Sequence, residues 1–327
     1  MSIVSPKIEQ SIRQEYDHQL STYKYLENEV VGLIKETCEA NKWIFVHRIK
    51  DISSYALKLL TGRTDRYFID DFLACTIVVP NLKGIEGARL LVKECFEILD
   101  EKPSEFVNYR PTEFNFDSIR LSCQVKKTVQ EKVYSGLKFE IQIKTLLEYA
   151  WSEATHDFSY KGSSASWARE RLAAQIKASL NNIDLSIYDM EKISTSSFLN
   201  KRNKSYEKLE ETLIFIKKEF GDAGVSIPND IKRLSEEVSR LLDRVKLDIS
   251  DLKDALDKET DAGRGLKTLN LSIYSIIIVS LFKQKQEVML SELAKKPSRR
   301  GPNLVIPKET NIMDLYDTSK FKCVTLL

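Results

Sequence analysis

The sequence predicts an α+β protein in which a mixed β-sheet flanked by helices is followed by an all-helical C-terminal region. Residues 137–145 alternate without a break between apolar and polar side chains, as a half-buried strand does. Strand-like and helix-like segments interleave up to about residue 195, and only helical periodicity follows. The strand places two sets of side chains on opposite faces: Leu137, Phe139, Ile141 and Ile143 on one, and Lys138, Glu140, Gln142 and Lys144 on the other.

The other elements follow from local periodicity. Apolar residues at helical spacing predict a long amphipathic helix over residues 6–41 and shorter helices over 52–60 and 84–96. The continuous apolar run 72–79 ends at Pro80, as expected of a central strand. Residues 118–125 alternate like a second strand. Helices are predicted from residue 146 to about 161 and over 167–190.

A polar stretch divides the chain. We expect one domain over residues 1–195, a linker over 196–204 and a helical domain over 205–327. In the second domain, apolar residues from Ile231 to Leu256 follow a heptad pattern with one four-residue stutter. Such a stripe is typical of a bundle core or a dimer seam. A homo-oligomer formed through these helices, or a restraint on the first domain, is therefore expected.

Composition narrows the class of protein. With 50 Lys and Arg against 48 Asp and Glu, the formal net charge is +2, so the chain lacks the global field of a dedicated nucleic-acid binder. Its five scattered cysteines form no CxxC pair, which favours a cytoplasmic protein with free thiols. The most apolar run, 269–282, is too short to cross a bilayer and predicts a buried helix, so no membrane partner is expected.

Four clusters carry side chains suited to phosphate chemistry. Arg48 and Lys50 alternate along an extended segment, and Lys58 follows on the next helix, beside the helix-opening serines 53 and 54. The second cluster is the Asp70–Asp71 pair ahead of the apolar strand, where a carboxylate can bind Mg²⁺. The third cluster contains Phe116, an aromatic residue that can stack on a base, and the fourth contains Glu140. Each cluster alone also fits an ordinary surface, turn or core.

Taken in order, the clusters resemble the RelA/SpoT-type alarmone synthetase domain, most closely over residues 47–161. The family's Glu-x-Gln-Ile-Arg-Thr strand reads Glu140-Ile-Gln142-Ile-Lys144-Thr here, and its His-Asp-x-x-Tyr-Lys helix end is present from His156 to Lys161. The resemblance implies a nucleotidyltransferase-like fold. It also implies transfer of the β,γ-pyrophosphate of ATP to the ribose 3′-hydroxyl of GDP or GTP.

The resemblance also implies roles for individual residues. Asp71 and Glu140 would be the catalytic carboxylates and the Mg²⁺ ligands, with Glu140 placed to deprotonate the 3′-hydroxyl. Cationic side chains would bind the ATP phosphates, and a further set would bind the acceptor. The first set is Arg48, Lys50, Lys58 and Lys144; the second is Phe116, Arg120, Gln142 and His156.

The sequence departs from the family mainly on the acceptor side. The stacking tyrosine is Phe116, the histidine four residues later is Arg120, and the arginine after the magnesium aspartate is Thr76. Lys144 replaces an arginine and keeps the charge without the bidentate fork. Three functions stay open: a synthetase acting on GDP, GTP or an adenine nucleotide, a toxin-type enzyme that pyrophosphorylates the tRNA 3′ end, and a catalytically silent module. In the second, Arg169, Arg171, Lys177 or the basic segment 295–300 would bind tRNA.

Overall fold

The computed structural model forms two compact units, Met1–Leu199 and Asn200–Leu327. It describes residues 7–62, 69–103, 118–126, 132–159, 166–196, 199, 201, 203–264, 270–296 and 304–327, with the backbone alone for 156–159. The two units are treated separately below.

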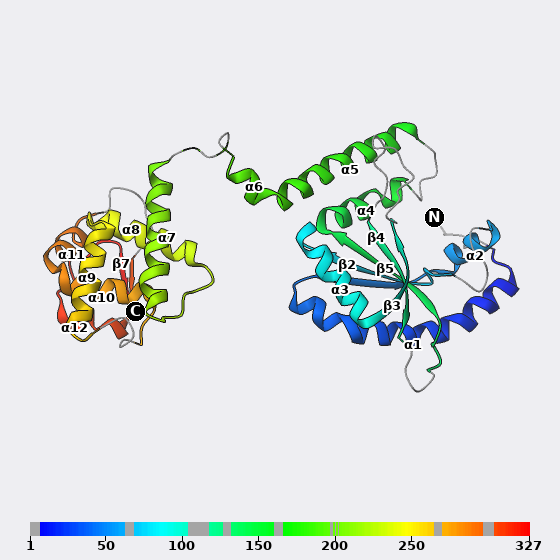
Figure 1. The fold of residues 1–327 in the computed structure, drawn as a ribbon, viewed down its shortest axis with the longest axis horizontal. Helices are drawn as coiled ribbons and strands as arrows, with labels where there is room; N and C mark the ends of the chain where they lie inside the picture. The colour runs from blue at the N-terminus through cyan, green and yellow to red at the C-terminus, as the bar shows by residue number, and fades with distance from the viewer. Residues whose placement is uncertain are drawn as a thin grey trace. The chain divides into compact units, whose positions relative to one another are not determined.

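The first unit is built on a five-stranded sheet with the order β1-β2-β5-β4-β3 (Figure 1). Its strands are β1 (Ile44–Ile49), β2 (Leu73–Val79), β3 (Phe96–Lys102), β4 (Ile119–Val125) and β5 (Lys138–Thr145). The β2–β5 pair is parallel and the other three pairs are antiparallel. The predicted mixed sheet is therefore confirmed, with the segment that contains Glu140 as its central strand.

The helices of this unit are α1 (Gln10–Ala40), α2 (Ile52–Leu60), α3 (Ile85–Cys95), α4 (Leu146–Ser159), α5 (Trp167–Tyr188) and α6 (Met190–Ser194), with a short 3₁₀ turn at Leu82–Gly84. The predicted helices are confirmed with small shifts at their ends. Strand β3 was not predicted, because Phe-Glu-Ile-Leu-Asp-Glu-Lys contains four charged residues and continues directly from a helix. It is an edge strand, and charged side chains are common on edges.

The core occupies one face of the sheet. Phe139, Ile141 and Ile143 of β5 are completely buried and belong to the same cluster as Leu26 and Val30 of α1. Helix α3 packs on this face too, and Figure 1 shows α1 and α4 on opposite sides of the sheet. The predicted apolar face of the central strand is thus the core face. The opposite face keeps its polar side chains.

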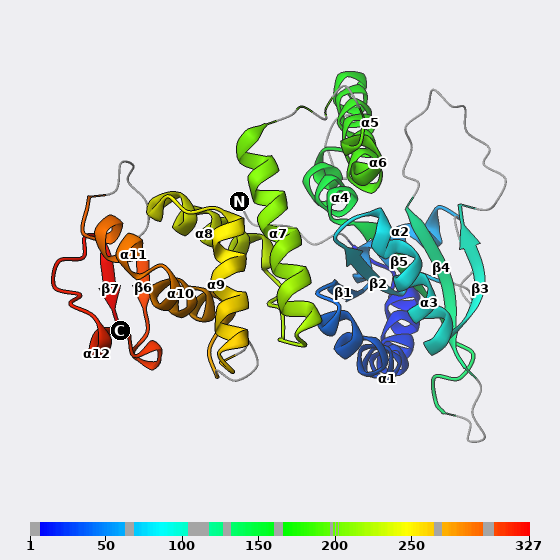
Figure 2. The same cartoon turned by 60° about the vertical axis from the view of Figure 1, so that its left-hand side comes forward.

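The second unit contains α7 (Lys204–Asp222), α8 (Ile231–Val245), α9 (Ile249–Asp261), α10 (Ile273–Gln284), α11 (Gln286–Leu293) and α12 (Ile312–Leu315) (Figure 2). A 3₁₀ turn (Lys308–Thr310) precedes α12. The short strands β6 (Leu304–Ile306) and β7 (Val324–Leu326) pair in parallel, so this unit is not purely helical. Three-residue strands leave too little alternation to be recognised in a sequence.

The heptad stripe of this unit does not run along one continuous helix. The chain leaves α8 at Lys246, whose φ of 56° is left-handed, and α9 starts afresh behind Asp248 with a capping box. The stripe residues Val238, Leu242 and Leu252 are nevertheless completely buried within the unit. The stripe is therefore part of the core of this unit, as expected of a bundle core.

The apolar run 269–282 forms most of α10, whose residues from Ile273 to Phe282 are nearly all buried. This confirms the predicted buried helix. Among the helices that the structure describes, none combines the length and the apolar character needed to cross a membrane.

Candidate active site

Asp71 lies between two lysines at the end of the sheet where β1 finishes and β2 begins. Lys50 Nζ donates to Asp71 Oδ2 at 2.6 Å and Lys58 Nζ donates to Asp71 Oδ1 at 2.8 Å. Burial alone would raise the pKa of Asp71, but the hydrogen bonds and charges of the two lysines outweigh it and hold the pKa below its usual value. This Lys50–Asp71–Lys58 cluster carries a net charge of about +1 and is partly exposed.

Aromatic packing fixes the position of this cluster. Phe72 is completely buried, and its ring centre lies 4.4 Å from that of Tyr23 and 5.3 Å from that of Tyr16. The Tyr16 hydroxyl donates to the Lys50 carbonyl at 2.9 Å, and the Lys50 amide donates to the Phe72 carbonyl at 2.8 Å. The backbone on both sides of the ion pair is thereby tied to α1.

The serines at the start of α2 do not offer free amide groups. Asp51 caps this helix, and its Oδ1 accepts from the amides of Ser53 at 3.1 Å and Ser54 at 2.9 Å. The expectation that these serines help to bind phosphate is therefore not supported by the geometry, since a carboxylate already occupies the helix N-terminus. The side chains of Lys50 and Lys58 remain the candidates for phosphate binding.

Glu140 lies in a row of side chains that crosses the polar face of the sheet. It is paired with Ala74 on β2 and with Ser122 on β4, and Ala74 is paired with Arg48 on β1. Directly paired residues share a face, so Arg48 and Glu140 lie on the same side of the sheet. The structure thus brings these two predicted site residues onto one surface.

Gln142 and Arg120 form the next row on this face. They are paired across β4 and β5, and Gln142 is also paired with Thr76 on β2. Gln142 Nε2 donates a short hydrogen bond to Glu140 Oε1, which fixes the orientation of that carboxylate. Glu140 has therefore a hydrogen-bonding neighbour two residues along its own strand, as the alternation predicts.

Asp70 is a carboxylate near this row that the sequence analysis left without a role. Its Oδ2 accepts from Ser122 Oγ at 3.0 Å, and Ser122 is the direct cross-strand neighbour of Glu140. The sequence did indicate the position of Ser122, because Ser122 lies on the polar side of the alternating segment 118–125.

Lys144 is nearly buried on the polar face. Only 6% of it is exposed, and its Nζ donates to Ser152 Oγ of α4 at 3.3 Å. Burial, reinforced by the Arg120 charge, lowers the pKa of Lys144 to about 8, although Glu153, Glu148 and Glu140 oppose the shift. Lys144 is thus a cation whose charge is sensitive to pH near neutrality.

Helix α5 holds the junction between β5 and α4. Thr145 Oγ1 donates to Asp184 Oδ2 at 2.6 Å, and the Thr145 amide donates to Glu148 Oε2 at 3.3 Å. Lys177 Nζ in turn donates to Glu148 Oε1 at 2.8 Å and lies 5.8 Å from the Trp151 ring centre. Lys144 precedes this junction directly, so its position depends on the network. Sequence reasoning missed Glu148 and Asp184, because contacts between α4 and α5 leave no periodic signal.

Lys177 corrects one expectation. It was a candidate for binding tRNA, but only 1% of it is exposed and it is paired with Glu148. A buried, paired ammonium cannot bind a phosphate backbone. Arg169 and Arg171 are exposed on α5, as expected.

Four other predicted positions lie wholly or partly outside the described residues. Phe116 and the Tyr160–Lys161 pair fall in undescribed segments, as do residues 297–300 of the basic segment. His156 is on α4, where only the backbone is described. The roles of these residues stay predictions.

The donor set fits a magnesium ion that is shared with phosphates. Among the described residues no three His, Cys, Asp or Glu side chains gather as a complete metal cage. Mg²⁺ is usually bound by one or two carboxylates together with phosphate oxygens. Asp71 and Glu140 are two partly exposed carboxylates beside lysines that can take the phosphates, so their chemistry suits a shared ion.

The sheet is mixed, with a helix-covered core on one face and a row of carboxylates and cations on the other. These features define an α+β domain with a candidate polyphosphate site. Residues 47–165 match the model of the region found in RelA/SpoT proteins. This part of the chain is therefore a RelA/SpoT-type domain. The matched segment includes every predicted site residue.

Solved structures with a similar fold include three bacterial proteins. Small alarmone synthetase 1 of Bacillus subtilis, bound to its product pppGpp, is 15% identical over 56% of this chain and all of that chain, with a TM-score of 0.46. Small alarmone synthetase 2 of Bacillus subtilis is 17% identical over 54% and 98%, with a TM-score of 0.45. A GTP pyrophosphokinase family protein of Streptococcus pneumoniae is 15% identical over 60% and 100%, with a TM-score of 0.42. No curated protein matches the chain. The family match, and not these likenesses, carries the assignment.

Proposed function

We propose that this protein transfers the β,γ-pyrophosphate of ATP to the 3′-hydroxyl of a free nucleotide. The RelA/SpoT-type domain supports this proposal. The observation that carries it is the Lys50–Asp71–Lys58 cluster, which holds two ammonium groups on one carboxylate. Mg·ATP would exchange both partners at once, because the metal replaces the lysines on Asp71 and the phosphates replace Asp71 on the lysines. Such an exchange keeps each charge compensated.

The reaction would proceed by displacement at the β-phosphorus. The 3′-oxygen forms a bond to that phosphorus, the bond from phosphorus to the α,β-bridging oxygen breaks, and AMP leaves with that oxygen. The hydroxyl proton passes to Glu140, whose carboxylate Gln142 orients. Bound Mg²⁺, held by Asp71 and Glu140, would supply charge neutralisation at the phosphates.

Cationic side chains would neutralise the remaining negative charge on the pyrophosphate. Lys50 and Lys58 approach from the β1–α2 side, Arg48 lies in the same row as Glu140, and Lys144 lies two residues beyond Gln142 on the same face. The acceptor would bind through Gln142 and Arg120, with Phe116 and His156 as further contacts. We favour GDP or GTP as the acceptor.

The direct test uses γ-labelled ATP and Mg²⁺ with GDP, GTP, ADP, ATP and bulk tRNA offered separately. We expect label in a guanine nucleotide and a loss of about a hundredfold or more in Glu140→Gln. Asp100→Asn is the matched control, because Asp100 is an exposed carboxylate in the same row on the edge strand β3. It should leave the rate unchanged.

Other outcomes would contradict the proposal in different ways. Label on tRNA alone would favour the toxin-type reaction, with Arg169 and Arg171 as the exposed cations that could contact the acceptor stem. Label in an adenine nucleotide would show that the acceptor is not a guanine nucleotide, while the proposed transfer reaction would stand. No transfer to any acceptor would make the domain a silent module.

A further inference from the structure

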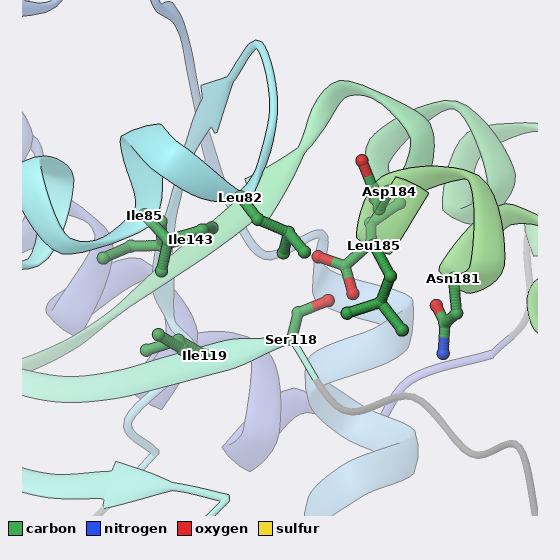
Figure 3. Close-up of a pocket in the computed structure, with 9 residues that line it drawn as sticks. Leu82, Ile85, Ser118, Ile119, Ile143, Asn181, Asp184 and Leu185 are labelled. Atoms are coloured by element: carbon green, nitrogen blue, oxygen red, sulfur yellow. The ribbon is translucent and has the colours of Figure 1, made fainter. Parts of the chain in front are cut away.

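A pocket of about 350 Å³ lies at the end of β5 opposite to the Lys50–Asp71–Lys58 cluster. Figure 3 shows Ser118 at the start of β4 on one side of it and Asp184, Leu185 and Asn181 of α5 on the other. Its volume lies within the range of small-molecule sites. The lining residues are Leu82, Ile85, Ser118, Ile119, Ile143, Glu148, Asn181, Asp184 and Leu185.

Two buried oxygen atoms in this pocket have no hydrogen-bond partner among the described residues. Asp184 is 3% exposed and Ser118 is 5% exposed. Asp184 Oδ2 accepts from Thr145, but Asp184 Oδ1 and Ser118 Oγ are both unsatisfied. A buried polar atom without a partner is costly, and most such atoms in folded proteins are paired. The two atoms therefore mark a place where a ligand supplies the missing hydrogen bonds.

The charges around the pocket favour one class of ligand. Glu148 is compensated, because its two oxygens accept from Lys177 Nζ and from the Thr145 amide. Among the described residues, Asp184 forms no ion pair, because the nearby Lys177 is bound to Glu148. Burial, reinforced by the Glu148 charge, raises the pKa of Asp184 despite the Thr145 hydrogen bond and the Lys177 charge. The pocket thus carries one uncompensated acidic group inside aliphatic walls.

We propose that this pocket binds a small organic cation, a primary ammonium or guanidinium group on a short apolar body. One N–H group of the cation donates to Asp184 Oδ1 and a second donates to Ser118 Oγ. The aliphatic side chains of Leu82, Ile119 and Ile143 pack against its methylene groups. The bound cation compensates the charge that the protein leaves open at Asp184.

This binding does not depend on the proposed transfer reaction. Ile143 lies on the core face of β5, whereas Glu140 and Gln142 lie on the opposite face. A failure of pyrophosphate transfer would therefore leave the binding proposal standing, and the reverse is also true.

The test measures binding of n-butylammonium and agmatine to the full-length protein by calorimetry, with n-butanol as the neutral probe of the same length. We expect both cations to bind and n-butanol to bind at least about tenfold more weakly. Asp184→Asn keeps the acceptor for Thr145 but presents an N–H group to the pocket, so it should weaken cation binding by about tenfold or more. Asp189→Asn, an exposed carboxylate on the same helix end, should change nothing.

Three results would overturn the proposal: equal binding of n-butanol, unchanged cation binding in Asp184→Asn, or no cation binding to the wild-type protein at millimolar concentrations. If Asp184→Asn does not fold, the pH dependence of the wild-type protein replaces it. Cation affinity should rise with pH through the raised pKa of Asp184, while the facing groups Glu148 and Lys177 stay paired. A flat profile would contradict the proposal, and Ser118→Ala should reduce affinity without changing the profile's shape.

Discussion

Asp71 and Asp184 belong to the same unit, but their surroundings shift the pKa values of the two carboxyl groups in opposite directions. Asp71 accepts from two lysines and has a lowered pKa, whereas Asp184 has a raised pKa and one oxygen without a hydrogen-bond partner among the described residues. Burial acts to raise the pKa of both carboxyl groups, so burial alone does not explain the opposite net shifts. What differs is the supply of cations, because Lys177, which lies near Asp184, is bound to Glu148.

The two aspartates therefore belong to two kinds of site. One already holds its counter-ions and can exchange them, and the other needs an added cation. The Lys50–Asp71–Lys58 cluster is complete without a ligand, and it can receive Mg·ATP only by exchanging partners. The Asp184 pocket is incomplete without a ligand. The same residue type therefore serves a binding site in two ways, depending on whether the protein itself provides the counter-charge.

The largest expected effect that tests this comparison concerns Lys177. Its ammonium group is the nearby cation, and it pairs with Glu148. In Lys177→Met the Glu148 carboxylate is left buried without its ammonium partner, and we expect a loss of about 3 kcal/mol or more in the free energy of unfolding. Denaturant unfolding followed by tryptophan fluorescence measures this loss. Trp43, Trp151 and Trp167 are the only tryptophans, and all belong to the first unit, so the signal reports on that unit alone.

Two controls sharpen this measurement. Lys192→Met removes a lysine whose side chain is 82% exposed and paired with Asp189, so it should leave the free energy of unfolding nearly unchanged. The double variant Lys177→Met, Glu148→Gln should recover part of the loss, because no charge is left buried. A loss in Lys177→Met no larger than that in Lys192→Met would show that the Glu148 pair does not hold the junction.

A smaller effect is expected at Asp71. A carboxylate whose folded pKa is depressed stabilises the fold above its unfolded pKa of about 4, and this stabilisation is lost as pH falls toward the folded pKa. We expect the wild-type first unit to lose about 1–2 kcal/mol over this acidic range through Asp71. Asp71→Asn should lack this part of the pH dependence, as unfolding at a series of pH values would show. Identical pH profiles for the two proteins would mean that the lysines do not stabilise the charged form.

The central strand was the part of the fold that sequence could predict best. Its alternation distinguishes the buried Ile141 from the polar Glu140, and the faces agree with the structure because period-two burial depends on adjacent residues only. The heptad stripe predicted core residues but not the break between α8 and α9. Its spacing survives the turn at Lys246, so a pattern of apolar residues could not reveal that the chain changes direction there.

The site was only partly predictable. The pairing of Lys50 and Lys58 with Asp71 joins three segments that are near in sequence, and motif order indicated it. The Glu148–Lys177 and Thr145–Asp184 contacts join residues 29 and 39 positions apart, and Lys177 read as a surface cation. Helix periodicity does not show which charged residues of α5 face another helix, so its buried ion pair could not be foreseen.

The smallest expected effect concerns Lys144, a cation on the same unit whose pKa is about 8. Burial lowers the pKa of its ammonium group, which donates to Ser152, so Lys144 loses its proton as pH rises through about 8. If the charge on Lys144 assists transfer, the wild-type rate should fall on the alkaline side of about pH 8. Lys144→Arg keeps its proton at these pH values, so its rate should stay level there, at a lower plateau because the side chain is larger. Stability gives an independent check: the unfolded state binds the proton more tightly than the folded state, so unfolding should become harder for wild type between about pH 8 and 10 but not for the arginine variant. A wild-type rate that stays constant through pH 9 would show that the transfer step does not use this charge.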